Sequence, residues 1–357
     1  MNTTVEGLIR QAYDQLKELD AVTALSLLQE ALKIDFEHPE VKYGLKCINW
    51  WLERVKKLDD FHEPYEKGVY VINQWKSFHV FLDQIDSSGN RPAGGSMPAD
   101  DSSSGSGSVP ANGAPGGDAP ADGSAPAGDS APRDSCLYAV RRFAFSLALK
   151  YFEDALTSSG SIPDPEILLL IGRCYKGSGN YEESVRFLEQ AVNQKPEDSG
   201  ALAELADVNA LLGDARAAKV LFREAFYIDP QSVDLWFMES EMIIRLKRKV
   251  AELGFEGREL AEWIPVYGSL WGVFSIQREL KPIELGKLKQ SILALESENS
   301  NKPGDFAKPR LLNRYFRLIE HYGVFRTRNI KDNSDVVEDT MRKIKFIDSA
   351  IYEQYRN

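Results

Sequence analysis

The segments ILLLIGRCYKGSGNYEESVRFLEQAVNQKP (167–196) and ALAELADVNALLGDARAAKVLFREAFYIDP (201–230) repeat one pattern of residues with a period of 34. Small, turn-forming and helix-ending residues recur in register. The equivalent pairs are Gly172 and Ala206, Gly179 and Gly213, Ser184 and Ala218, Ala191 and Ala225, and Pro196 and Pro230. A repeat of this length is typical of a helix–turn–helix unit that stacks on copies of itself.

Each position of the pattern has a physical role. The small residues let two helices approach closely, and the large residues between them fill the remaining space. Gly179 and Gly213 supply the left-handed backbone that ends a first helix, and Pro196 and Pro230 end a second helix. The Gly-Ser-Gly at 177–179 is therefore predicted to be a turn between helices and not a phosphate-binding loop.

The pattern resembles the tetratricopeptide repeat family, with units at 165–198 and 199–232. Weaker matches cover 5–85, where Ala12, Ala24 and Ala31 take the small places, and 136–164. A third unit is expected to begin at 233, with Trp236 as its first bulky residue and Ser240 as its small one. The resemblance implies an all-α helical solenoid.

The family binds protein partners in a concave groove lined by the first helix of each unit. Carried over by position, the resemblance implies the following groove residues: Leu169, Arg173, Lys176, Ala203, Asp207, Asp234, Phe237 and Glu241. Their mixed charge suits a peptide or an amphipathic helix of a partner. Leu169 and Arg173 stand where relatives that bind chaperone tails carry lysine and asparagine, so that class of partner is not indicated. The alternative for Phe237 is that it packs under the C-terminal helices.

Four segments follow from composition: repeats at 1–85, an insert at 86–135, repeats at 136–250 and a C-terminal helical region at 251–357. The insert has ten Gly, seven Pro and no aromatic residue in 50 positions, which predicts disorder. The C-terminal region is expected to form helices at 258–280, 282–298, 309–328 and 337–355 that cap the solenoid.

A second candidate surface is the arginine-rich stretch at 310–328. Its arginines are Arg310, Arg314, Arg317, Arg326 and Arg328, interleaved with aromatic residues. One interpretation is an RNA-binding surface of a regulatory protein. The other is an amphipathic helix with its aromatic side chains facing inward and its arginines in solvent.

The remaining features argue against other classes of protein. The chain has a net charge of −11, with +4 in residues 241–357 and −15 in residues 1–240, so a nucleic-acid-coating protein is not expected. The four histidines and three cysteines show no metal-ligand spacing, and no catalytic motif or cofactor-binding loop occurs. No apolar run is long enough to span a membrane and the first twenty residues lack a signal-peptide pattern. We therefore expect a non-enzymatic, cytoplasmic scaffold without cofactors, working in a larger assembly of bacterial origin.

Overall fold

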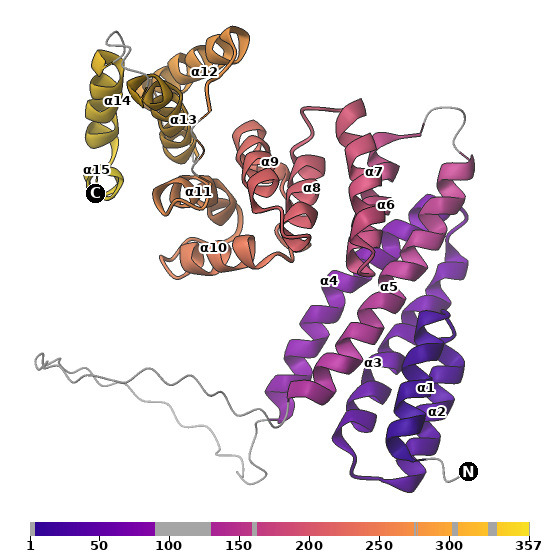
Figure 1. Ribbon diagram of the computed structural model, residues 1–357. Helices are drawn as coiled ribbons and strands as arrows, with labels where there is room; N and C mark the ends of the chain where they lie inside the picture. Colours follow the sequence, from indigo (N-terminus) through magenta and orange to yellow (C-terminus); the bar gives the residue numbers. More distant parts are fainter. Residues whose placement is uncertain are drawn as a thin grey trace, which may run out of the picture. The chain divides into compact units, whose positions relative to one another are not determined.

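The computed structural model describes residues 4–89, 130–158, 163–274, 276, 278–301, 306–327 and 334–356. All regular secondary structure in these residues is helical, which confirms the predicted all-α class (Figure 1). Most of the predicted insert, residues 90–129, lies outside the described part. Its two ends differ from the prediction, because helix α4 continues to Gly89 and helix α5 begins at Ser130.

The chain forms two compact units, Met1–Asp59 with Tyr70–Ala144 and Asp60–Val69 with Phe145–Asn357. Helix α4 (Pro64–Gly89) and helix α5 (Ser130–Ser158) each contribute residues to both units. The boundary therefore falls inside helices, and not at 250 where the sequence changes from repeats to the C-terminal region.

The first unit begins with α1 (Val5–Lys17), α2 (Ala21–Ile34) and α3 (Pro39–Val55), followed by the short 3₁₀ helix η1 (Lys56–Asp60). Thr4 and Asp20 cap α1 and α2, because their side-chain oxygens accept the N–H groups of Gly7 and Thr23. Ala12, Ala24 and Ala31 are fully buried, so the small positions predicted for this repeat lie in its core. An aromatic cluster of Trp50, Trp51, Trp75, Phe78 and Phe143 completes that core.

The second unit contains the two strongest repeats: α6 (Pro165–Gly177) with α7 (Tyr181–Gln194), and α8 (Ser199–Leu211) with α9 (Ala215–Ile228). The predicted register is confirmed. Gly179 and Gly213 follow the first helices with φ of 86° and 89°. The Ser184 hydroxyl donates to the carbonyl of Gly172 at 2.7 Å, so α6 and α7 lie in close contact at this point.

The predicted third unit is wrong at its start. After the 3₁₀ turn η2 (Pro230–Ser232), residues 233–240 are not helical, and helix α10 runs only from Glu241 to Ala251. The physical reason is that the carboxylate of Asp207 accepts the backbone N–H groups of Glu239 and Ser240, both at 2.8 Å. Those two N–H groups are therefore not available for the hydrogen bonds of a helix.

Five further helices follow: α11 (Gly257–Leu270), α12 (Pro282–Asn301), α13 (Ala307–Thr327), α14 (Ser334–Ile347) and α15 (Ser349–Arg356). The first expected helix is shorter than predicted, because the chain turns at Gly272 with φ of 70°. The last expected helix is two helices, since Asp348 ends α14 and accepts the N–H of Ile351 at the start of α15.

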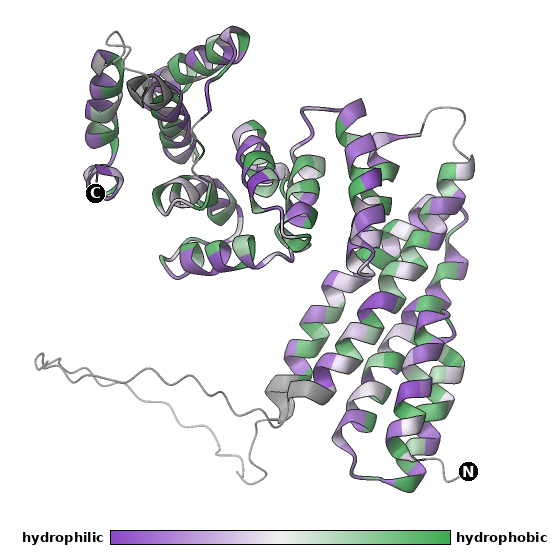
Figure 2. Ribbon diagram, in the orientation of Figure 1, coloured by the Kyte–Doolittle hydropathy of each residue, from purple (hydrophilic) through white to green (hydrophobic). Residues whose placement is uncertain are grey.

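The C-terminal helices cap the last repeat, as expected. Phe222 and Phe226 of α9 share one buried cluster with Phe274, Leu312 and Phe316. Hydrophobic and hydrophilic residues are interspersed along these helices (Figure 2).

Candidate functional site

The predicted groove residues of α6 and α8 lie together in a buried ion-pair network. Arg173 Nε lies 2.6 Å from Glu204 Oε1, and Lys176 Nζ lies 2.6 Å from Glu204 Oε2 and 2.7 Å from Asp207 Oδ2. The side chains of Lys176, Glu204 and Asp207 have no exposed surface, and that of Arg173 is 10% exposed. Burial by itself would lower the pKa of Lys176, but Asp207 and Glu204 raise it, and the net direction is upward. The lysine is therefore held charged inside the protein.

Residues 233–240 of the same chain cover this network. Lys176 Nζ donates to the carbonyl oxygen of Phe237 at 2.6 Å, while Asp207 accepts the two N–H groups of Glu239 and Ser240. The Phe237 ring lies 4.2 Å from the guanidinium carbon of Arg173 and 6.4 Å from the ring centre of Phe145. The inner face of these two repeats thus holds a non-helical segment of its own chain.

This arrangement corrects the groove assignment. Lys176, Asp207 and Phe237 cannot contact a partner in this conformation, because they are at most 3% exposed. Phe237 packs on Arg173 and Phe145, and not under the C-terminal helices as the alternative held. The rest of the predicted set does not form an open surface with them: Ala203 is buried, Leu169 and Asp234 are partly buried, and Glu241 is exposed and paired with Arg245.

The arginines of α13 are likewise engaged inside the second unit. Arg310 forms hydrogen bonds of 3.1 and 2.9 Å from Nε to the two carboxylate oxygens of the buried Glu262. Arg317 pairs with Glu224 at 2.8 Å, and Arg314 and Arg317 lie 4.3 and 3.9 Å from the ring centre of Tyr227. Neither sequence interpretation predicted this, because both left the arginines at the surface. Arg328 and the side chain of Arg326 lie outside the described residues.

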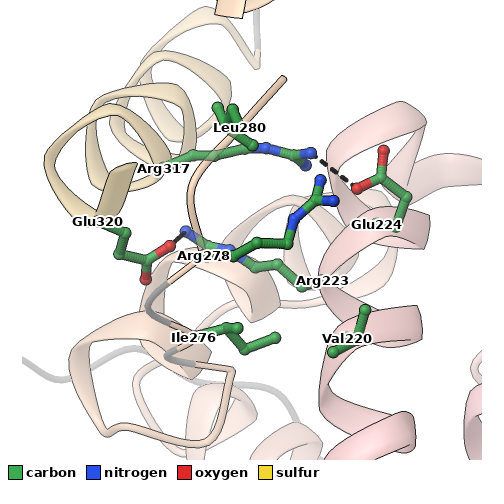
Figure 3. A pocket seen from close by; sticks show the side chains of 8 residues that line it. All are labelled: Val220, Arg223, Glu224, Ile276, Arg278, Leu280, Arg317 and Glu320. Atoms are coloured by element: carbon green, nitrogen blue, oxygen red, sulfur yellow. Dashed lines mark hydrogen bonds and ion pairs between the residues drawn. The ribbon is translucent and has the colours of Figure 1, made fainter. Parts of the chain in front are cut away.

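Arg317 also lines a small hollow with Arg223 and Arg278 (Figure 3). Two carboxylates offset this positive charge, since Arg223 pairs with Glu320 at 2.6 Å and Arg317 with Glu224. The hollow has a volume of about 30 Å³, which is on the scale of a water molecule. Arg223 and Arg317 therefore join α9 to α13, while Arg278 pairs with Glu284 of α12.

An open cleft of about 410 Å³ lies in the first unit. Its walls come from α1, from the start of α3 and from the start of α5: Glu6, Ile9, Arg10, Tyr13, Asp14, Lys17, His38, Glu40, Ser135, Tyr138 and Ala139. The sequence contained a signal for it. Leu169 and Arg173 stand three before and one after the small Gly172, and the same offsets from Ala12 give Ile9 and Tyr13. The inner face of the N-terminal repeat is therefore the one that is open.

The polar groups of this cleft are arranged for hydrogen bonding. The Tyr13 hydroxyl donates to Glu40 Oε1 at 2.9 Å, and burial, with Cys136 and Glu40 nearby, raises the pKa of Tyr13. Nδ1 of His38 is buried and has no hydrogen-bond partner in the described part of the chain. Arg10 is exposed at the rim and Tyr138 is 54% exposed. The cleft thus offers an apolar wall, an exposed aromatic side chain and charges of both signs.

Other kinds of site find no support in the described ranges. There, no three His, Cys, Asp or Glu side chains are placed to hold a metal ion, and no helix is both long and apolar enough to cross a membrane. The three cysteines, Cys47, Cys136 and Cys174, are buried free thiols. His321 accepts the N–H of Leu280 and His79 packs against Trp75, so both have structural roles.

Comparison with known proteins agrees with this architecture. A family model described as tetratricopeptide repeat matches residues 139–208, which run from α5 to α8. No curated protein and no solved structure matches the chain. Such repeats serve as protein-interaction modules in general. The residue register, the helix pairs and the family match together show that residues 139–208 carry tetratricopeptide repeats.

Proposed function

We propose that this protein is a non-enzymatic scaffold that binds a segment of a partner protein in the cleft of its N-terminal repeats. The observation that carries this proposal is the open cleft of about 410 Å³ on the inner face of α1 and α3. The equivalent face of α6 and α8 is filled by residues 233–240 of the chain itself.

The chemistry of the cleft supports a protein ligand. Ile9 contributes a small apolar part of the wall, and the exposed Tyr138 adds an aromatic side chain of the kind that dominates binding energy at protein interfaces. Arg10 and Lys17 alternate with Glu6 and Asp14 along one helix, so the charges are mixed. A peptide or an amphipathic helix of mixed charge fits this surface better than a polyanion does.

We also propose a cytoplasmic location within a larger assembly of bacterial origin. The three buried free thiols support a cytoplasmic location, because the cytoplasm is a reducing compartment in which thiols stay reduced. The composition of residues 86–135, rich in Ala, Pro, Gly, Asp and Ser, supports the bacterial origin.

The test is site-specific photo-crosslinking in cells with p-benzoylphenylalanine placed at position 138. The matched control places it at position 36, because Phe36 is another exposed aromatic residue of the first unit, at 69%, and does not line the cleft. We expect a partner that crosslinks at 138 and not at 36, and that is lost on Arg10→Glu but retained on Lys33→Glu. Equal crosslinking at the two positions, with a normal thermal melt for each protein, would contradict the proposal.

A further inference from the structure

A second exposed surface surrounds helix α10 in the second unit. The helix, EMIIRLKRKVA, turns Ile243, Leu246 and Val250 inward and carries four basic residues against one acidic residue. Arg245 is paired with Glu241, Arg248 and Lys249 are exposed, and Lys247 is partly buried.

An apolar cleft of about 360 Å³ opens beside this helix. It is lined by Leu235, Trp236, Met238, Ile243, Ile244, Lys247, Arg248 and Ala251. Of the apolar lining, Leu235 and Ile244 are partly buried, Met238 is 6% exposed and Trp236 is 58% exposed. A hollow with an apolar floor and an exposed indole is suited to receive one apolar side chain of a partner.

Trp236 is held in this position by its neighbours in the chain. Phe237 points the other way, into the network of Lys176 and Arg173, and its carbonyl is bonded to Lys176. The N–H of Trp236 donates to Asp234 Oδ1 at 3.3 Å. The contacts that close the inner face of the repeats therefore also fix the indole in an outward position, which lowers the entropy lost when a partner binds.

Two cations stand at the cleft beside the indole. Lys247 Nζ lies 5.7 Å from the centre of the Trp236 ring and donates to the carbonyl of Leu235 at 3.3 Å. Burial lowers the pKa of Lys247, while Asp234 opposes that change, so a carboxylate brought to the cleft would be favoured by a partly desolvated ammonium. Arg248, which is exposed, adds a second cation at the rim.

From this geometry we propose that the Trp236 cleft is a second partner site, which binds a short acidic protein segment by an apolar anchor residue flanked by carboxylates. The apolar floor takes the anchor and the two cations of α10 take the carboxylates. A nucleic acid or an anionic bilayer presents an extended negative array, whereas this cleft offers two cations beside an apolar hollow, which fits a short segment. The site does not depend on the N-terminal cleft, and with both sites the chain would join two partners.

The experiment measures binding of the full chain to labelled peptides by fluorescence anisotropy. The probe is Asp-Glu-Phe-Leu-Asp-Glu, with Lys-Arg-Phe-Leu-Lys-Arg and Asp-Glu-Gly-Ser-Asp-Glu as charge and anchor controls. We expect the first peptide to bind at least tenfold tighter than either control. Trp236→Ala should weaken that binding about 30-fold, the loss typical of an interface hot spot. Arg248→Glu should weaken it several-fold, and more strongly at low salt.

Matched variants separate this site from general effects. Trp271→Ala removes another partly exposed tryptophan with a lysine over its ring, outside the cleft, and Arg216→Glu reverses an exposed charge on α9. Both should leave peptide binding and the thermal melt unchanged. Equal binding of the acidic and basic peptides, or binding that survives Trp236→Ala in a folded protein, would overturn the proposal. So would Trp236-dependent binding of a single-stranded oligonucleotide or a phosphatidylserine vesicle when the acidic peptide does not bind.

Discussion

Lys176 and Asp207 meet at 2.7 Å in the interior of the second unit, and neither side chain has exposed surface. In the repeat pattern these two positions face the groove where a partner would lie. Here they bond the backbone of residues 237–240 instead. Two charged residues that the repeat pattern places in the partner-binding groove therefore stabilise the interior of the protein instead.

Lys176→Met should destabilise the protein by about 3–5 kcal/mol, because it leaves the buried carboxylate of Asp207 without its cation and leaves Glu204 with Arg173 alone. Equilibrium urea unfolding measures this. The control is Lys195→Met, which removes the lysine of a solvent-exposed pair with Asp198 and should change stability little. If the two substitutions have equal effects, the network is not a structural element.

Phe237→Ala should cost about 3–5 kcal/mol, as removal of a buried aromatic side chain does. Its neighbour supplies the comparison, because Trp236 is 58% exposed and Trp236→Ala should leave the free energy of unfolding nearly unchanged. Adding Arg173→Glu to Phe237→Ala places a second carboxylate beside Glu204 and should lower the melting temperature further. A double variant that melts like the unchanged protein would show that residues 233–240 do not fill this face.

Gly172→Ala should destabilise the central repeat by about 1–3 kcal/mol, because the added Cβ would lie 2.6 Å from Cγ of Leu188. Gly172→Val, which is larger and β-branched, should cost more. Gly286 of α12 is the control, since a Cβ there meets nothing within 4 Å. Gly286→Ala should stabilise the protein by about 0.5–1 kcal/mol, as alanine does in a helix. Thermal unfolding of the three variants tests the register of the repeat.

Arg310→Ala should destabilise the second unit by about 1–3 kcal/mol, because it removes the charged partner of the buried Glu262 carboxylate. Binding of a single-stranded RNA, followed by anisotropy against salt concentration, should be weak and unaltered by the substitution. RNA binding that falls on Arg310→Ala while the melt is preserved would restore the alternative of an RNA-binding surface on this helix.

Stability should fall as the pH decreases from 7 to 5, partly through His321. Burial lowers the pKa of His321, with Lys289 acting in the same direction and Glu279 against it, and Nδ1 accepts the N–H of Leu280 at 2.9 Å. Since the folded state resists protonation, the unfolded state binds more protons below its ordinary pKa of about 6.5. This contribution is therefore fully present above that pH and is lost as the pH falls toward the lower pKa of the folded state.

The check on this pH effect is urea unfolding at several pH values for the unchanged protein and for His321→Gln. His79, whose pKa burial also lowers, is present in both proteins, so its effect cancels in the difference. The stability difference should move in favour of His321→Gln as the pH decreases. A difference that is independent of pH would show that His321 does not titrate in this range.

The N-terminal cleft could have been found from the sequence, whereas the filled face could not. Ile9 and Tyr13 follow from Ala12 by the offsets that relate Leu169 and Arg173 to Gly172. Nothing local to Trp236 or Ser240, however, distinguishes the start of a helix from the non-helical turn observed. The deciding bonds join Lys176 to Phe237, which are 61 residues apart.

The sequence by itself determined the all-α class, the 34-residue register, the small residues at helix contacts and the glycines and prolines that end helices. These features depend on backbone conformation and on side-chain size, which act over one or two helical turns. The tertiary structure decided which inner face is open, where Trp236 points, and that Arg310 and Arg317 hold the C-terminal helices in place. Those outcomes depend on which charged groups are buried together and form ion pairs. The residue pattern within one helix does not show which distant segment packs against that helix.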